Sequence, residues 1–192
     1  MPRHIFVAKV EDQPGVLNRV ASLFRRRNFN IESLTVGRAE QPGVSRMTVV
    51  VETTEAGARI VEANLYKLVN VLQVDDLTRK PAMNRELGLV KVAVTPDSRG
   101  QILQLVDVFR ARVVDVDEAS VVIEVTGTPE KIGKFELVMR PYGILELVRT
   151  GVVAMARGHD PLPANPPLVC DEGANSKSST PPDPHSDLAM SV

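Results

Sequence analysis

The chain has 192 residues, of which 43% are hydrophobic, and its 23 Lys and Arg against 24 Asp and Glu give a formal net charge of −1. This length allows one domain or two small ones, and the apolar fraction is enough for a buried core. The balanced charge argues against nucleic-acid binding through a strong positive field. No apolar run approaches the roughly 18 residues of a membrane span, and the N-terminus has no signal-peptide pattern. We expect a cytoplasmic protein with no nucleic-acid or membrane partner.

Residues 159–192 differ in composition from the rest of the chain. They hold seven of the 14 prolines, and five acids against one base, Lys177, give them a net charge of −4. Such a segment buries too little apolar surface to offset the entropy lost on ordering. We expect a disordered, Pro-rich, acidic tail. It carries Cys170, the one cysteine of the chain, so an intrachain disulfide and a multi-thiolate metal site within one chain are excluded.

Hydrophobic periodicity in the first part of the chain predicts the order β-α-β-β-α-β. A nearly continuous apolar run indicates a buried strand at His4–Val10, and apolar residues at helical spacing follow the turn Asp12–Gly15. Thr54 is placed to N-cap a second helix. The remaining strands are expected at Ile31–Val36, Met47–Val51 and Val71–Leu77.

The same order recurs after an expected linker at Lys80–Asn84. Thr128 and Pro129 supply the N-cap and the first residue of the later helix, which stops before Pro141. The earlier helix has its apolar face at Ile102, Leu105, Val106 and Phe109. Strands are predicted at Leu89–Thr95, Val113–Val116, Val121–Val125 and Gly143–Val148.

This repetition predicts an α+β fold of two ferredoxin-like βαββαβ domains. Leu23-Phe24-Arg25 matches Val108-Phe109-Arg110 in its place within the unit, so the halves form a degenerate repeat. Right-handed crossovers put both helices of each unit on one face of a four-stranded antiparallel sheet. We expect the two domains to span residues 1–79 and 85–158.

Three predicted strands are apolar on both faces, at Ile5–Ala8, Val49–Val51 and Val121–Ile123. Antiparallel strands with one solvated face alternate between apolar and polar residues instead. The face opposite the helices must therefore be covered by the other half of the chain, by a second copy or by a partner. We expect an oligomer, at least a dimer.

Catalysis is poorly supported by the first 158 residues. They contain one histidine, His4, and no P-loop, G-x-G-x-x-G, H-E-x-x-H or G-x-S-x-G spacing, so we expect no catalytic residue and no metal site. An RNA-recognition module needs aromatic residues on its central strands, and residues 46–51 have none. An acylphosphatase-like enzyme needs a basic loop after the first strand, but residues 11–15 are acidic. Arg25–Arg27 is expected to be a solvated helix end that complements the helix dipole.

The loop before the first helix suits an α-amino acid. Pro14-Gly15 opens the helix, so the N–H groups of Gly15, Val16 and Leu17 are expected to be free to bind a carboxylate. Asp12 offers an acceptor for an ammonium group, while Val16 and Leu17 offer an apolar wall for an aliphatic side chain. The alternative is an ordinary N-cap in which Asp12 binds its own backbone.

Several segments carry a more specific resemblance. Residues 10–20, VEDQPGVLNRV, resemble the opening strand, loop and helix of ACT domains, which are small amino-acid-sensing modules. Together with RNFNIESLTV at 27–36, SRMT at 45–48, KLVNVL at 67–72 and residues 85–92, they resemble the regulatory small subunit of acetolactate synthase, also called acetohydroxyacid synthase. The resemblance covers roughly residues 2–158 and does not extend to the tail.

The resemblance implies a non-catalytic subunit that binds the acetolactate synthase catalytic subunit, activates it and confers feedback inhibition by valine in branched-chain amino acid biosynthesis. Thiamine diphosphate, magnesium and FAD would belong to the catalytic subunit, with no cofactor in this chain. Valine would lie between the ACT domains of a homodimer. Its ligands would be Asp12, Gly15, Val16 and Leu17 of one chain and Asn30 and Ile31 of its neighbour.

Two questions stay open at this point. Some relatives have asparagine at the position of Asp12, so the effector can be valine, leucine or isoleucine. The other function considered is a free-standing ACT amino-acid-binding regulator without a catalytic partner. A basic DNA-binding helix pair would favour that alternative, and the sequence shows none.

Overall fold

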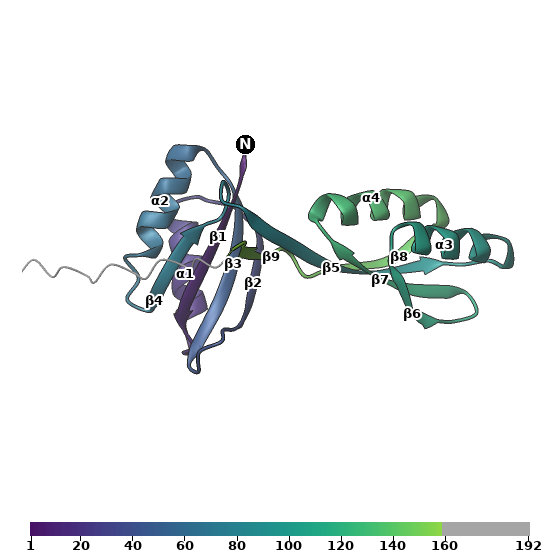
Figure 1. Ribbon diagram of the computed structural model, residues 1–192, viewed down its shortest axis with the longest axis horizontal. Helices are drawn as coiled ribbons and strands as arrows, with labels where there is room; N and C mark the ends of the chain where they lie inside the picture. The colour runs from purple at the N-terminus through teal and green to yellow at the C-terminus, as the bar shows by residue number, and fades with distance from the viewer. Residues whose placement is uncertain (159–192) are drawn as a thin grey trace, which may run out of the picture.

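The computed structural model describes residues 1–158, so the tail expected at residues 159–192 lies outside the described residues. The first unit consists of β1 (Arg3–Glu11), α1 (Val16–Arg26), β2 (Ile31–Arg38), β3 (Val44–Glu52), α2 (Glu55–Leu65) and β4 (Val71–Asp76). Its strands form an antiparallel sheet in the order β2-β3-β1-β4, with β2 and β4 at the edges. Figure 1 shows α1 and α2 together on one side of this sheet, as right-handed crossovers require.

The second unit repeats this plan. It consists of β5 (Ala82–Ala93), α3 (Pro96–Val108), β6 (Arg112–Val116), β7 (Ser120–Gly127), α4 (Pro129–Met139) and β8 (Ile144–Arg149), with a short 3-10 helix at Arg140–Tyr142. The strand order β6-β7-β5-β8 matches that of the first sheet. The predicted fold class of two ferredoxin-like βαββαβ units is therefore confirmed.

The helix starts follow from local side-chain chemistry. The Thr54 hydroxyl accepts a hydrogen bond from the Gly57 N–H at the start of α2, and Thr128 accepts one from the Lys131 N–H at the start of α4. Both N-caps were predicted from the sequence. Each satisfies one of the backbone donors that a helix leaves unpaired at its first turn.

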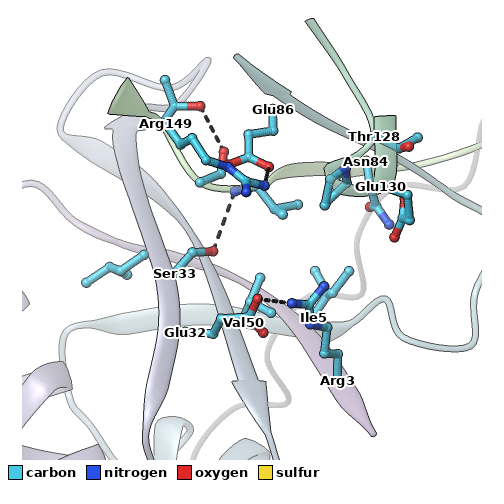
Figure 2. Close-up of a pocket in the computed structure, with 15 residues that line it drawn as sticks. Arg3, Ile5, Glu32, Ser33, Val50, Asn84, Glu86, Thr128, Glu130 and Arg149 are labelled. Atoms are coloured by element: carbon cyan, nitrogen blue, oxygen red, sulfur yellow. Dashed lines mark hydrogen bonds and ion pairs between the residues drawn. The ribbon is translucent and has the colours of Figure 1, made fainter. Parts of the chain in front are cut away.

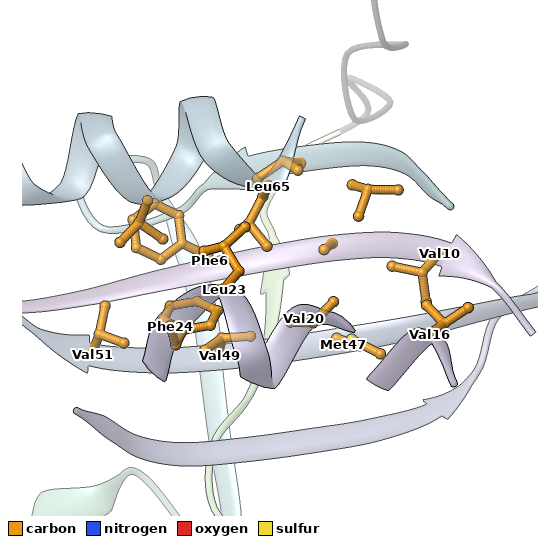
Figure 3. Packing of buried hydrophobic residues seen from close by; sticks show 14 of the residues in the cluster. Phe6, Val10, Val16, Val20, Leu23, Phe24, Met47, Val49, Val51 and Leu65 are labelled. Atoms are coloured by element: carbon orange, nitrogen blue, oxygen red, sulfur yellow. The ribbon is translucent and has the colours of Figure 1, made fainter. Parts of the chain in front are cut away.

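The main core of the first unit lies between its sheet and its two helices (Figure 3). Alternate residues of β1 and β3 point to this side, because successive side chains of a strand face opposite ways. They meet the apolar faces of α1 and α2 in a cluster that includes Phe6, Val10, Val16, Val20, Leu23, Phe24, Met47, Val49, Val51 and Leu65. This packing fixes both ends of α1 relative to the sheet.

The expected linker at Lys80–Asn84 is wrong over its last three residues, because β5 begins at Ala82 and continues to Ala93. The first four residues of β5 pair with β9 (Val153–Ala156), a strand that the sequence did not predict. The later residues of β5 pair with β7 and β8 in the second sheet. A single strand therefore connects the two units (Figure 1).

The side of the first sheet opposite its helices is covered by the same chain. Val7 and Val50 are 0% and 3% exposed there and pack with Val152 and Ala154. Arg46 of β3 donates from Nη2 to the carbonyl oxygen of Ala154 at 2.7 Å, and burial lowers the pKa of its guanidinium. The sequence left three possible covers for this face: the other half of the chain, a second copy or a partner. At Val7 and Val50 the cover is the later part of the same chain. A homodimer stays a prediction.

Candidate functional site

The loop before α1 leaves the helix start without a side-chain cap. Gly15 is the N-cap residue, with φ 85°, a left-handed conformation that glycine adopts without steric cost, and no side chain bonds to the first turn. The alternative in which Asp12 caps the helix is therefore wrong. Asp12 instead accepts a hydrogen bond from Ser45 Oγ at 3.2 Å through Oδ1, and its N–H donates to the Gly43 carbonyl at 2.8 Å.

Two details of the expected site change in the structure. The Val16 N–H was expected to be free, but it donates to the Gln13 carbonyl in a long, 3.4 Å hydrogen bond. The Val16 side chain was expected to form an apolar wall, but it is 4% exposed and belongs to the core (Figure 3). Leu17 is 45% exposed, so it is the apolar side chain available at this helix start.

Asn30 and Ile31 lie beyond the other end of α1. The chain turns there through Asn28, a non-glycine residue with φ 56°, and the Phe29 N–H closes the turn on the Phe24 carbonyl at 3.0 Å. Asn30 is exposed, and Ile31 packs partly against the core. They line a hollow of about 410 Å³ together with Ala21, Phe24, Arg25, Asn28 and Phe29.

The structure does not bring the two groups of predicted residues together within one chain. Asp12 and Gly15 precede α1, while Asn30 follows it, and an 11-residue helix is about 16 Å long. The two groups also lie at opposite ends of β2. This edge strand begins next to Asn30 and ends in the turn whose Gly43 carbonyl accepts the Asp12 N–H. We call Asp12–Leu17 the loop half-site and Asn30–Ile31 the strand half-site.

A larger cavity, of about 660 Å³, lies between the two units and was not predicted (Figure 2). Glu86 of β5 and Arg149 of β8 form a doubly hydrogen-bonded ion pair in its wall, and Arg3 pairs with Glu32 across from them. Its lining comes from β1, β2, β3, β5, the start of α4 and the segment from the end of β8 to Val152. Segments this far apart in sequence give no local signal that could have predicted the cavity.

The charged groups in this cavity are largely satisfied by one another. Glu130, in the first turn of α4, has its pKa lowered by a hydrogen bond from its own backbone N–H and by the Thr128 hydroxyl. The Arg149 guanidinium has its pKa raised by the hydrogen bonds to Glu86. The Asn84 Oδ1 atom is buried without a hydrogen-bond partner among the described residues. This arrangement joins the units through two ion pairs, and it leaves Glu130 as an exposed carboxylate without an ion-pair partner among residues 1–158.

The described residues offer little for catalysis. His4 is 1% exposed, its Nδ1 lies 3.4 Å from Thr78 Oγ1, and its ring stacks on Phe6. Within residues 1–158 no three His, Cys, Asp or Glu side chains are grouped so that they could hold a metal ion. Over the same residues, none of the helices combines the length and the apolar character needed to cross a bilayer.

Comparison with known proteins gives the same family for both units. Residues 6–73 match the AHAS small subunit-like ACT domain, and residues 85–158 match the family described as small subunit of acetolactate synthase. A probable acetolactate synthase small subunit from Archaeoglobus fulgidus is 50% identical over 157 residues, which cover 82% of this chain and 98% of that protein. The acetolactate synthase small subunit of Mycolicibacterium smegmatis is 47% identical over 157 residues, covering 82% and 92%.

A solved structure agrees with these sequence matches. The crystal structure of the acetolactate synthase small subunit from Thermotoga maritima superposes with a TM-score of 0.78 at 36% identity, covering 83% of this chain and 100% of that one. A small subunit implies a catalytic subunit as its partner. With both units matched and the fold shared, the chain belongs to the acetolactate synthase small subunit family.

Proposed function

We propose that this chain is the regulatory subunit of acetolactate synthase, which activates the catalytic subunit and makes it sensitive to feedback inhibition by valine. One observation carries the effector part of the proposal. The loop half-site and the strand half-site lie at opposite ends of one edge strand, β2, where pairing of two copies would join them. We assign sensing to an ACT domain over residues 1–79 and support of the dimer to residues 85–158, in a cytoplasmic complex.

The pairing geometry follows from the strand order. In the described chain β2 pairs with β3 on one side, so its other side can accept a strand from a second copy. A two-fold axis perpendicular to the sheet pairs the two β2 strands antiparallel and keeps all four helices on one face. Antiparallel pairing brings the start of one β2 to the end of the other. Asn30 then approaches Asp12 of the partner subunit.

The combined groups match the parts of a branched-chain amino acid. The uncapped start of α1, with its positive dipole end, suits the carboxylate. Asp12 uses one carboxylate oxygen for Ser45, which leaves the other for the ammonium group. The Asn30 amide both donates and accepts, so it can bind either group. Leu17 and Ile31 provide apolar surface for the aliphatic side chain.

Feedback inhibition then follows from linkage. Valine bound between two chains favours the dimer arrangement in which both half-sites fit it. Valine can shift the equilibrium between the active and the less active arrangement only by as much as its affinity for the two arrangements differs. Binding of valine and binding of the catalytic subunit are therefore reciprocally coupled.

Calorimetric titration with valine tests this proposal, with leucine and isoleucine as competing effectors. We expect saturable binding by the wild-type chain and its loss in Asn30→Ala. Gln104→Ala, which removes an exposed carboxamide from α3, is the matched control and should bind as the wild type does. The second readout is the activity of the catalytic subunit with and without each variant.

The outcomes separate the two functions considered. Activation of the catalytic subunit together with valine inhibition that disappears in Asn30→Ala supports the regulatory subunit. Valine binding without any effect on the catalytic subunit supports a free-standing ACT regulator instead. A folded dimer that binds none of the three amino acids, alone or with the catalytic subunit, would refute the effector site.

A further inference from the structure

The last turn of α1 carries a group of cations that the proposed effector site does not use. Arg25, Arg26 and Arg27 are exposed at the end of this helix, and Lys67 is exposed in the turn after α2. We call these four residues the basic cluster. Three of them line a hollow of about 510 Å³ between α1 and α2, whose full lining is Leu23, Arg26, Arg27, Asn64, Lys67 and Leu68.

None of the four cations pairs with a carboxylate of residues 1–158. The only side-chain hydrogen bond that the described residues give the cluster runs from Arg27 Nη2 to Asn64 Oδ1, at 3.4 Å. Single cations elsewhere in the first unit, such as Arg38 and Arg59, also lack an acidic partner among the described residues, but four cations there are paired. Arg3, Lys9, Arg79 and Lys80 each have an acidic partner. Like charges gathered without counter-charges repel one another, so the cluster costs free energy in the isolated chain.

The helix dipole accounts for Arg25 and Arg26 in the last turn of α1 and not for all four cations. A positive side chain in the last turn is stabilised by the helix dipole, and the effect fades beyond that turn. The last turns of α2, α3 and α4 carry no basic residue, and Arg140, the C-cap of α4, is paired with Glu136. Lys67 lies outside any helix. The cluster is therefore a feature of the first unit and is not a general need of the repeated fold.

The chemistry of the hollow suits an acidic protein surface. Leu23 is 6% exposed and Leu68 is half-buried, so the lining between the cations is apolar. A guanidinium binds a carboxylate through two parallel hydrogen bonds and stacks on apolar or aromatic surface. Arginine is accordingly enriched at protein interfaces, where lysine is depleted. Arg26 and Arg27, beside the apolar side chains that line the hollow, have the composition of such an interface.

The position of the cluster gives it a link to the effector site. Arg25 lines the hollow that contains Asn30 and Ile31, and the next residue, Arg26, lines the basic hollow. One helical turn thus borders both surfaces. The β2 edge lies on the sheet, whereas the cluster lies on the helix side, so pairing of two copies through β2 leaves it accessible.

We propose that the basic cluster docks an acidic surface of the acetolactate synthase catalytic subunit. This inference rests on the proposed function, because it needs the catalytic subunit as a partner. Docking supplies the missing counter-charges and relieves the repulsion within the cluster. It also places the partner beside the strand half-site, so that valine and the catalytic subunit act on the same turn of α1.

The test measures association of the full chain with the purified catalytic subunit, by a kinetic binding assay at two salt concentrations. Arg26→Glu/Arg27→Glu should weaken binding about tenfold or more, mainly through the association rate. Arg26→Gln/Arg27→Gln should give a smaller loss without reversing the charge at the helix end. Arg110→Glu/Lys134→Glu makes the same charge change at exposed positions of the second unit and should leave binding unchanged. Circular dichroism checks that each variant is folded.

High salt provides a second criterion. Raising the salt from about 0.05 M to 0.5 M should weaken wild-type binding much more than binding by the Arg26→Gln/Arg27→Gln variant, because exposed charges are screened. Equal affinity of the cluster variants and the control would refute the docking surface while leaving the proposed function intact. A wild-type chain that fails to bind the catalytic subunit at either salt concentration would refute both. Saturable binding of inorganic phosphate by the wild-type chain that is lost in Arg26→Gln/Arg27→Gln, with unchanged affinity of that variant for the catalytic subunit, would identify a small-anion site and refute the docking surface.

Discussion

Arg149 holds Glu86 with two parallel hydrogen bonds, from Nε to Oε1 at 2.8 Å and from Nη2 to Oε2 at 2.7 Å. The Glu86 side chain is 4% exposed, and Arg149 is 34% exposed. The pair joins β5 to β8 where both strands leave the second sheet and approach the first unit (Figure 2). The ion pair therefore connects β8, an edge strand of the second sheet, to the part of β5 that lies at the boundary between the two units.

Breaking this pair should destabilise the fold because it leaves a buried carboxylate without a partner. We expect Arg149→Met to lower the free energy of unfolding by about 3 kcal/mol, at the lower end for a buried pair since Arg149 is partly exposed. Glu86→Gln/Arg149→Met should recover more than half of that loss, because no buried charge remains. Urea unfolding of the variants measures both values. Equal stability of the single and double variants would contradict this account.

Gly151 lies close to β2 at the boundary between the units. Its φ is 80°, and a Cβ built there would lie 2.9 Å from the Ser33 Cβ on β2. Gly151→Ala should therefore destabilise by the cost of a left-handed conformation, about 1–2 kcal/mol, plus the cost of moving β2 away. Gly158→Ala isolates the conformational cost, because Gly158 has φ 93° and no neighbour within 4 Å of the added Cβ.

Adding Ser33→Gly to the Gly151→Ala variant removes the opposing Cβ. It should therefore recover the stability that Gly151→Ala loses in excess of Gly158→Ala. Thermal unfolding followed by circular dichroism gives the comparison. If Gly151→Ala costs no more than Gly158→Ala, the approach of this segment to β2 is not tight in solution.

Glu130 makes the start of α4 sensitive to acid. Its pKa lies below the ordinary value of 4.5, chiefly because its own backbone N–H and then the Thr128 hydroxyl bond to the carboxylate. A carboxyl group with a lowered pKa in the folded state adds stability above its unfolded pKa and loses it as the pH falls through the folded value. The stability advantage of the wild type over Glu130→Gln should therefore be present at pH 7 and shrink below about pH 4.5.

Denaturant titrations between pH 7 and pH 3 measure this difference. Glu118→Gln replaces another exposed carboxyl group in the second unit and serves as the control. A constant difference between the wild type and Glu130→Gln over this range would show that the carboxylate form is not favoured by folding.

Local sequence patterns predicted the elements of both repeats well. The elements that were missed depend on pairing between segments far apart in the sequence. Thr54 and Thr128 were identified as N-caps because capping depends on residues within one turn. β9 was missed because its pairing with Ala82–Arg85 joins segments about seventy residues apart, and neither segment has a strong apolar alternation. The extension of β5 into the expected linker was missed for the same reason.

The candidate site shows a similar division. Glycine before an apolar helix indicated an open helix start, and the structure has it at Gly15. The partners of Asp12 and Val16 depended on Ser45 and Gln13, which no spacing rule connects to a ligand site. The boundary cavity draws on six segments, so only the folded chain reveals it.

The exposed edge of β2 should control both dimer formation and effector binding. Val36 is 43% exposed and lies close to the middle of β2, so a two-fold axis there would bring both Val36 side chains into the new interface. Val36→Asp removes apolar surface and sets two carboxylates near the axis. We expect dimerisation to weaken about tenfold or more, because each carboxylate loses solvation in the interface and repels the other across the axis.

Sedimentation velocity measures the dimer, and calorimetry measures valine binding to the same samples. Val69→Asp makes the same change at an 80% exposed valine in the turn before β4, away from the β2 edge, and should leave both unchanged. Asn30→Ala should lose valine binding but stay dimeric, whereas Val36→Asp should lose both together because the half-sites come from two chains. Undiminished valine binding by a monomeric Val36→Asp chain would place the complete effector site within one chain and refute its assembly across β2.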